Sequence, residues 1–147
     1  MKTINKAPMI IILLLIGCTS LGTYANGPLF KDIPVSPSGN SILCIYRVDS
    51  IHMNTPMIYI DNTPFVKLDK KGYSWVYLKN GLYKIKIDFD KFGYTPFYTE
   101  ILIKGGEEIY LRLYDIGGSI RLNNYTKEKA KEEIKDFRFI EPITVKY

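Results

Sequence analysis

Alternation of apolar and polar residues with a period of two is the feature that most constrains the fold of this 147-residue chain. The clearest case is residues 82–89, LYKIKIDF, where apolar and charged side chains alternate from Tyr83 onward. The apolar set is Tyr83, Ile85, Ile87 and Phe89, and the charged set is Lys84, Lys86 and Asp88. Because successive side chains of a strand point to opposite faces, this pattern predicts a half-buried strand with its lysines in water. Residues 97–104 and 108–115 alternate in the same way and predict two further strands.

Turn signals separate these stretches at intervals of about 8 to 12 residues, which is typical of a sandwich. Residues 41–48 and 73–78 are apolar on both faces, so we expect them to be central strands. Residues 57–61 and 65–69 flank a predicted turn, and residues 118–123 add a last short strand. The sequence therefore predicts an all-β fold, an antiparallel β-sandwich of about seven or eight strands with one short C-terminal helix.

The predicted helix covers residues 126–136, TKEKAKEEIKD. Thr126 is a suitable N-cap, and the glutamates and lysines that follow have the spacing of i,i+4 pairs. Ala130 and Ile134 give the helix a narrow apolar stripe. Residues 137–147 contain enough apolar side chains for an edge strand or a docked tail.

The N-terminus carries an apolar run that ends on a cysteine. Lys2 and Lys6 precede an unbroken apolar stretch, residues 9–16, which is shorter than the roughly 20 residues that span a bilayer. Such a segment is typical of a cleaved export signal. Its end, Leu15-Ile16-Gly17-Cys18, resembles the bacterial lipobox. The resemblance implies cleavage before Cys18 and attachment of a diacylglycerol to its thiol.

The resemblance to a lipobox implies three regions. They are a lipoprotein signal peptide at 1–17, a lipid-anchored flexible tether at 18–40, rich in Gly, Pro, Ser and Asn, and a β-sandwich domain at 41–147. In lipoproteins of the enteric type, the absence of Asp directly after the cysteine, where Thr19 stands here, implies an outer-membrane location facing the periplasm. The alternative is an ordinary secretory signal cut after Thr23-Tyr24-Ala25, which would discard Cys18.

The charge of the chain is only mildly basic. Its formal net charge is +5, but Lys2 and Lys6 belong to the leader, so +3 remains after cleavage. This excess is smaller than the footprint of a nucleic-acid-binding domain, and we expect no nucleic-acid partner.

Several turns and strand starts between residues 41 and 134 resemble those of a known group of domains. They are Asp61-Asn62, Gly72-Tyr73, Asn80-Gly81-Leu82-Tyr83 and Gly106-Glu107. In this order they resemble the PEGA-like and transthyretin-like β-sandwich domains of bacterial surface proteins, and most closely a family of small lipoproteins of unknown function. The resemblance implies a sandwich fold and carries over no catalytic residue.

Metal and cofactor sites are not expected. His52 is the one histidine of the chain and has no second histidine or cysteine close by in sequence, whereas a metal site needs three or four ligands. The sequence contains no glycine-rich phosphate loop, nucleophile elbow or zinc spacing, so it predicts no cofactor.

Catalysis by a thiol or by paired carboxylates is the weaker hypothesis. Cys44 lies inside an apolar stretch, where a cysteine is usually a small core residue. Glu107 and Glu108 would point to opposite faces of a strand, and Asp88 and Asp90 fall at a predicted strand exit. We therefore expect that the chain is not an enzyme.

The candidate binding site is aromatic. Tyr73, Trp75 and Tyr77 share one parity of a predicted strand and can stack against a sugar ring or a partner, with Arg47 and Arg112 as candidate contacts for an anion. The alternative is that the same stripe forms core against the other sheet or the helix.

Together these features predict a lipid-anchored cell-envelope lipoprotein that acts without chemistry, as a binding or accessory module for an envelope protein or polymer. The alternatives are a secreted or periplasmic inhibitor or effector domain, and an envelope enzyme that uses Cys44.

Overall fold

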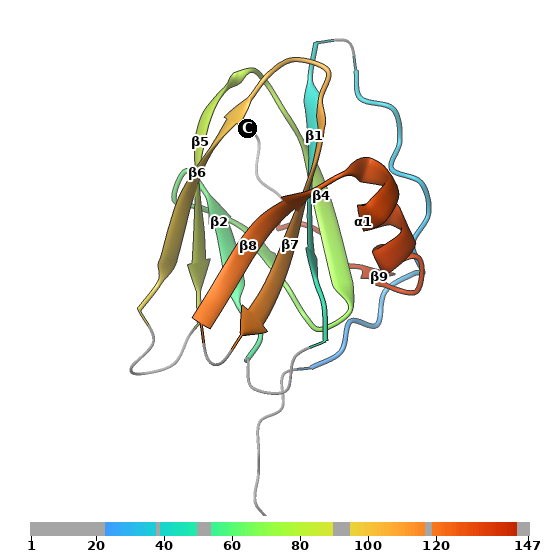
Figure 1. The fold of residues 1–147 in the computed structure, drawn as a ribbon, viewed down its shortest axis with the longest axis vertical. Helices are drawn as coiled ribbons and strands as arrows, with labels where there is room; N and C mark the ends of the chain where they lie inside the picture. The colour runs from blue at the N-terminus through green and yellow to red at the C-terminus, as the bar shows by residue number, and fades with distance from the viewer. Residues whose placement is uncertain (1–22, 38, 50–53, 90–94, 117–118, 144–147) are drawn as a thin grey trace, which may run out of the picture.

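The computed structural model describes residues 23–37, 39–49, 54–89, 95–116 and 119–143. These residues form two β-sheets packed face to face, with one short helix beside them (Figure 1). The predicted all-β sandwich is therefore confirmed.

The strands follow the predicted stretches closely. They are β1 (Ser41–Arg47), β2 (Met57–Ile60), β3 (Thr63–Lys67), β4 (Gly72–Leu78), β5 (Gly81–Asp88), β6 (Phe97–Ile103), β7 (Glu108–Ile116), β8 (Ser119–Tyr125) and β9 (Arg138–Phe139). One sheet has five strands in the order β8-β7-β1-β4-β9, and the other has four in the order β3-β2-β5-β6. The turn between β2 and β3 uses positive φ angles at Asp61 (48°) and Asn62 (65°), which residues of these types tolerate.

The pairing is antiparallel except at two places. β1 pairs with β7 in parallel, and β4 pairs in parallel with the two-residue β9. The chain leaves β1, builds the whole four-stranded sheet and β4, and then returns beside β1 in the same direction. All seven residues of β1 are buried, as is expected of a strand with a parallel neighbour and both faces covered.

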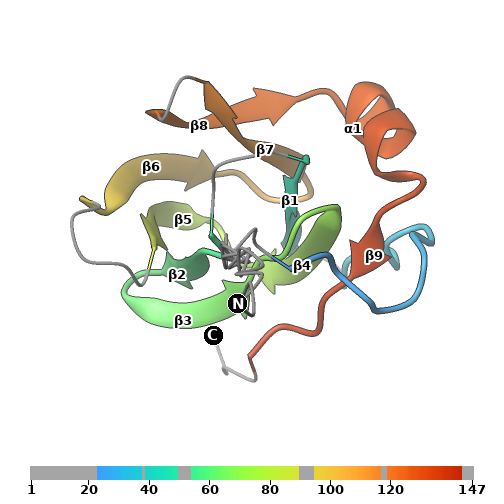
Figure 2. The same ribbon diagram turned by 90° about the horizontal axis from the view of Figure 1, so that it is seen from below.

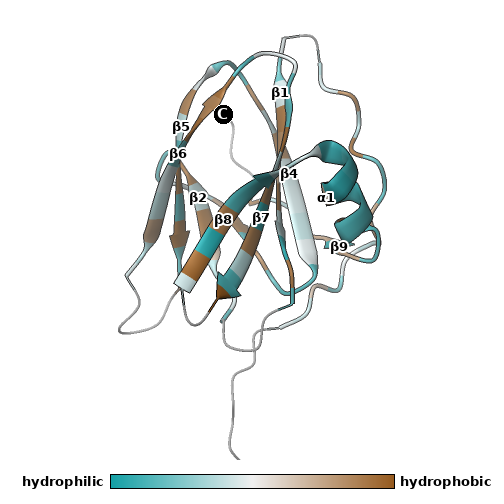
Figure 3. Ribbon diagram, in the orientation of Figure 1, coloured by the Kyte–Doolittle hydropathy of each residue, from teal (hydrophilic) through white to brown (hydrophobic). Residues whose placement is uncertain are grey.

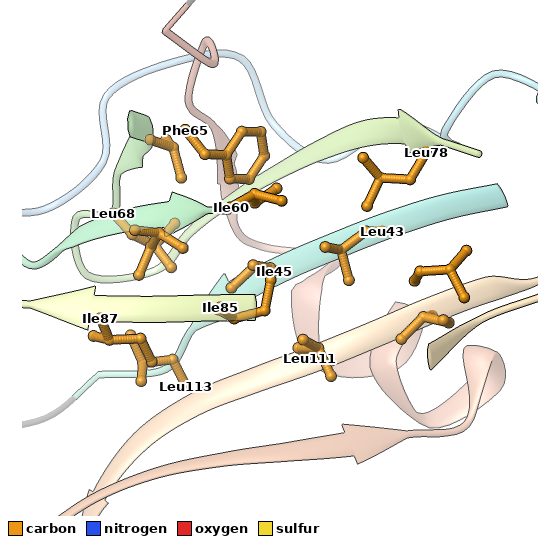
Figure 4. Packing of buried hydrophobic residues seen from close by; sticks show 14 of the residues in the cluster. Leu43, Ile45, Ile60, Phe65, Leu68, Leu78, Ile85, Ile87, Leu111 and Leu113 are labelled. Atoms are coloured by element: carbon orange, nitrogen blue, oxygen red, sulfur yellow. The ribbon is translucent and has the colours of Figure 1, made fainter. Parts of the chain in front are cut away.

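The main core lies between the two sheets (Figure 4). Its fully buried members come from both inner faces and include Leu43, Ile45, Ile58, Ile60, Phe65, Val66, Leu68, Ile85, Ile87 and Leu113. Burying each such side chain stabilises the fold by about 1.5–3 kcal/mol relative to leaving it in water. Ile85 and Ile87 point inward as the period-two pattern predicts.

Helix α1 (Lys127–Ile134) covers the outer face of the five-stranded sheet (Figure 2). The Thr126 hydroxyl accepts a hydrogen bond from the amide of Lys129, so the predicted cap is confirmed. The helix is hydrophilic over most of its surface (Figure 3), and it buries only Ala130 and Ile134. These two residues belong to a second core, which also contains Cys44, Tyr46, Tyr73, Tyr110 and Phe137.

The described part of the N-terminal segment, residues 23–37, lies against the domain. It runs along the side of the sandwich to reach the start of β1 (Figure 1). Two isolated bridges, Tyr24 with Lys70 and Leu29 with Arg138, join it to the domain. This docked course differs from the flexible tether that we predict for residues 18–40, because main-chain hydrogen bonds hold the segment although its composition is that of a linker.

The C-terminal residues close one side of the sandwich. After β9, the amide of Ile140 donates to the Tyr73 carbonyl oxygen at 2.8 Å. The amide of Ile143 donates to the Phe65 carbonyl oxygen at 2.7 Å. The expected edge strand and the expected docked tail are therefore both present in one continuous segment.

Candidate functional site

The aromatic stripe lies on the outer face of the five-stranded sheet. Tyr73, Trp75 and Tyr77 share one face of β4, because they pair with Tyr46, Cys44 and Ile42 of β1 in register. Tyr73 is only 3% exposed, because the ring of Phe30 meets it edge-on at 5.2 Å and Phe139 lies 5.5 Å from it. This end of the stripe is therefore core, which is the alternative that the sequence left open.

The other two members of the stripe are half-buried. The rings of Trp75 and Tyr77 meet at 5.1 Å in an edge-to-face arrangement, and Phe139 lies 6.3 Å from Trp75. The Tyr77 hydroxyl donates to the Pro34 carbonyl oxygen at 3.2 Å. The N-terminal and C-terminal segments thus occupy much of the surface that a ligand would need.

Arg112 sits on the same outer face and is engaged by its neighbours. Its Nε lies 3.1 Å from Glu133 of α1, and Nη1 donates to the Tyr125 hydroxyl at 3.2 Å. The guanidinium also stacks on the rings of Tyr114 and Tyr125, at 4.8 and 5.3 Å. The Tyr46 hydroxyl donates to the same Glu133 carboxylate at 2.9 Å. These contacts hold the helix against the sheet. The positive charge of Arg112 is paired with Glu133, so it is not available to an anionic ligand.

Arg47 lies on the opposite face of the sheet. It has the parity of Leu43 and Ile45 and is fully buried between the sheets, where Nη1 donates to the Leu68 carbonyl oxygen at 3.0 Å. Burial lowers the pKa of Arg47 to about 10, and the charges of nearby aspartates act in the opposite direction. The structure therefore does not bring Arg47 to the stripe or to Arg112.

Cys44 is buried under the helix. Burial raises the pKa of its thiol, and the negative charge of Glu108 raises it further. A nucleophilic cysteine needs solvent access and a stabilised thiolate, and the surroundings of Cys44 provide neither. The geometry supports the interpretation of Cys44 as a core residue.

The outer face of the four-stranded sheet is exposed, and we call it the open face. Its central members come from β2, β5 and β6 and are Tyr59, Leu82, Lys84, Lys86, Tyr98 and Leu102. Leu82, Tyr98 and Leu102 are 61%, 49% and 60% exposed. Within the described parts of the chain, the helix and the N-terminal segment lie beside the other sheet and leave this face uncovered (Figure 2).

Lysines and aromatic rings alternate across the open face. The Lys86 ammonium lies 4.5 Å from the centre of the Tyr59 ring, and that of Lys84 lies 4.8 Å from the centre of the Tyr98 ring. Lys86 also pairs with Asp88 at 2.7 Å, and this hydrogen bond raises the pKa of the lysine. The face therefore presents flat rings beside positive charges.

Sequence reasoning identified the lysines of this face but missed its apolar members. Leu82 has the parity of Lys84 and Lys86, so an apolar side chain stands in an otherwise charged row. Leu102 and Tyr98 have the outward parity in β6 and flank Glu100. Apolar residues at outward parity are the signal that could have located the face.

Some predicted residues lie outside the described part of the chain, namely Cys18, His52 and Asp90. Among the residues that are described, no three His, Cys, Asp or Glu side chains come close enough together to hold a metal ion. In the described part of the chain, no helix is long and apolar enough to cross a membrane.

Comparison with known proteins does not assign the chain to a family. No family model matches the chain, and a search of curated proteins finds no match. The resemblance to PEGA-like and transthyretin-like domains of small lipoproteins therefore stays a prediction.

Proposed function

We propose that the chain is a lipid-anchored module of the cell envelope that is acylated on Cys18 and binds an envelope partner without chemistry. The observation that carries the proposal is the position of Thr23, Tyr24 and Ala25. The Thr23 carbonyl accepts from the amide of Lys70, and the amide of Ala25 donates to the Lys70 carbonyl, both at 2.9 Å. A secretory cut after Ala25 would remove residues that belong to the fold, whereas a cut before Cys18 keeps them. This supports the lipobox over the alternative cleavage site.

The open face is the surface that best suits a partner. The aromatic stripe is largely covered by the chain's own segments, whereas Tyr98, Leu82 and Leu102 of the open face are about half exposed or more. Tyrosine rings stack on sugar rings, and nearby lysines pair with acidic groups. An envelope polymer with acidic groups fits this face, and a protein partner is the other outcome of the binding test.

The anchor is tested by mass spectrometry of the mature N-terminus from membrane and soluble fractions. We expect a chain that begins at Cys18 and carries the mass of two or three acyl chains. An unmodified N-terminus at Asn26 refutes the proposal and favours a secreted or periplasmic inhibitor or effector domain.

The binding surface is tested by co-sedimentation with the isolated insoluble cell-wall polymer. A Lys84→Ala/Tyr98→Ala variant should lose binding, and a Trp75→Ala variant should keep it. If binding depends on Trp75 and not on Lys84 and Tyr98, the binding site is the aromatic stripe and not the open face. Binding of the native protein that is unaffected by either variant excludes both surfaces.

A further inference from the structure

The first described residues are held by a cluster of side chains at one end of the sandwich. The Tyr24 hydroxyl donates to Asp49 at 2.6 Å, and the Lys70 ammonium lies 5.7 Å from the centre of the Tyr24 ring. The Thr23 hydroxyl donates to Asp69, which also accepts from Thr55 at 2.7 Å. We call these six residues, with the main-chain bonds of Thr23 and Ala25 to Lys70, the N-terminal clamp.

The N-terminal clamp marks one end of the long axis of the molecule. Lys70 directly precedes β4, whose first residue, Gly72, pairs with Arg47 at the end of β1. From the clamp the chain runs towards the opposite end, where the Tyr77 hydroxyl holds Pro34 before β1 begins (Figure 1). The first described residues therefore meet the domain at the clamp end.

The distance from the clamp to Cys18 is short. Thr23 is five residues after Cys18, and these five steps span at most about 18 Å when fully extended. A free tether from Cys18 to Asn40 would reach about 75 Å on the same basis. Docking of residues 23–37 removes most of that reach.

From this geometry, and resting on the proposed acylation of Cys18, we propose that the clamp sets the orientation of the domain on the membrane. The clamp end faces the lipid headgroups, and the end that carries Lys79 and Gly106 points away. The long axis of the sandwich, along which the strands run, then stands upright from the surface (Figure 1). The open face is consequently presented sideways, clear of the lipid.

The side chains at the clamp end suit a headgroup layer. Tyr24 is 56% exposed, and Ile116 at the end of β7 is 62% exposed. Lys71, which directly precedes β4, is also exposed at this end. An aromatic ring, an aliphatic side chain and a cation are residue types that lie well at a lipid–water interface.

The test places one fluorescent donor at either end of the acylated protein in vesicles that carry an acceptor on lipid headgroups. Ser119→Cys labels the clamp end and Lys79→Cys the far end, since both side chains are exposed. Cys44 is fully buried and Cys18 is acylated, so the introduced thiol is the reactive one. The ends differ by more than about 20 Å along the strands, and we expect markedly stronger transfer from position 119.

A matched variant tests whether the short connection to Cys18 causes the difference in energy transfer between the two labels. Inserting ten Gly and Ser residues between Gly22 and Thr23 keeps every contact of the clamp but lengthens the connection to the lipid. The insertion should abolish the difference between the two labels without changing the urea midpoint. A difference that survives the insertion refutes the short connection as its cause.

Two further outcomes separate this inference from the proposed function. Equal transfer from both labels in acylated protein overturns the orientation and leaves the lipid anchor intact. An N-terminus without acyl chains, measured by mass on the same sample, overturns both.

Discussion

Replacing Gly27 with alanine tests whether close main-chain contact holds the N-terminal segment against the domain. A Cβ at this position would lie 1.9 Å from the carbonyl oxygen of Phe139. The two main chains would have to separate by about 1.5 Å before that contact became ordinary. Because the obstructing atom belongs to the backbone, no side-chain rotation can relieve the clash, and the segment must lift.

The expected loss of stability follows from the contacts around Gly27. Three hydrogen bonds flank it: Phe30 N to Phe137 O at 2.8 Å, Phe139 N to Pro28 O at 2.7 Å, and Arg138 Nη1 to Gly27 O at 2.8 Å. Each contributes about 1 kcal/mol net, and the aromatic contact of Phe30 adds about 1 kcal/mol. We expect the free energy of unfolding to fall by about 2 to 4 kcal/mol, since part of the segment can stay in place.

Urea denaturation measures this change, and Gly81→Ala is the matched control. A Cβ on Gly81 would meet the Tyr83 ring at 3.5 Å, an ordinary contact, so the control should stay within about 0.5 kcal/mol of the native protein. Hydrogen exchange at the amides of Phe30 and Phe139 should accelerate only in Gly27→Ala. Native stability together with native protection of both amides in that variant would refute the reasoning.

Three more changes probe the second core and the helix above it. The Cys44 thiol should resist alkylation at pH 8 until denaturant is added, because it is fully buried; modification at the rate of a free thiol in native buffer contradicts that burial. Ile134→Ala should cost about 2 to 5 kcal/mol in urea unfolding and free the helix, whereas a loss under 1 kcal/mol would mean that the helix is not held by this side chain. Burial raises the pKa of Glu108, but hydrogen bonds from Lys127 and Tyr110 outweigh it, so the pKa is lower than the ordinary 4.5. Its contribution is present above pH 4.5 and is lost as the pH falls through the lowered value; Glu108→Gln should flatten the dependence of Tm on pH in that range, and an unchanged profile argues against the pairing.

Local pattern was enough to predict the strands and the helix. The alternation in residues 82–89 placed Ile85 and Ile87 in the core and the lysines outside, because parity alone decides which face a strand residue takes. Thr126 was recognisable as a cap because its hydroxyl needs only the amide three residues ahead. Both features depend on neighbours within a few residues, which the sequence displays directly.

Features that depend on distant partners were not predictable in this way. Parity does not say which strands become neighbours, so the parallel pairing of β1 with β7 was not expected. Residues 23–30 are held by main-chain hydrogen bonds, which hydropathy does not record. Arg47 is different, because its parity with Leu43 and Ile45 already pointed to the interior. Because arginine is charged, we expected Arg47 on the surface, although the alternation placed it on the inner face.

The pairing of β1 has a consequence for how the chain folds during synthesis. Every residue of β1 is buried, yet its two neighbours in the sheet begin at Gly72 and Glu108, long after β1 has left the ribosome. Contacts of such large sequence separation form slowly, because the loop between them must close before any contact is gained. The fully buried strand β1 therefore lacks its second neighbour in the sheet until residues up to Leu113 have emerged. During that interval the apolar side chains of β1 lack part of their cover, and we expect the incomplete chain to be a substrate for a holdase chaperone.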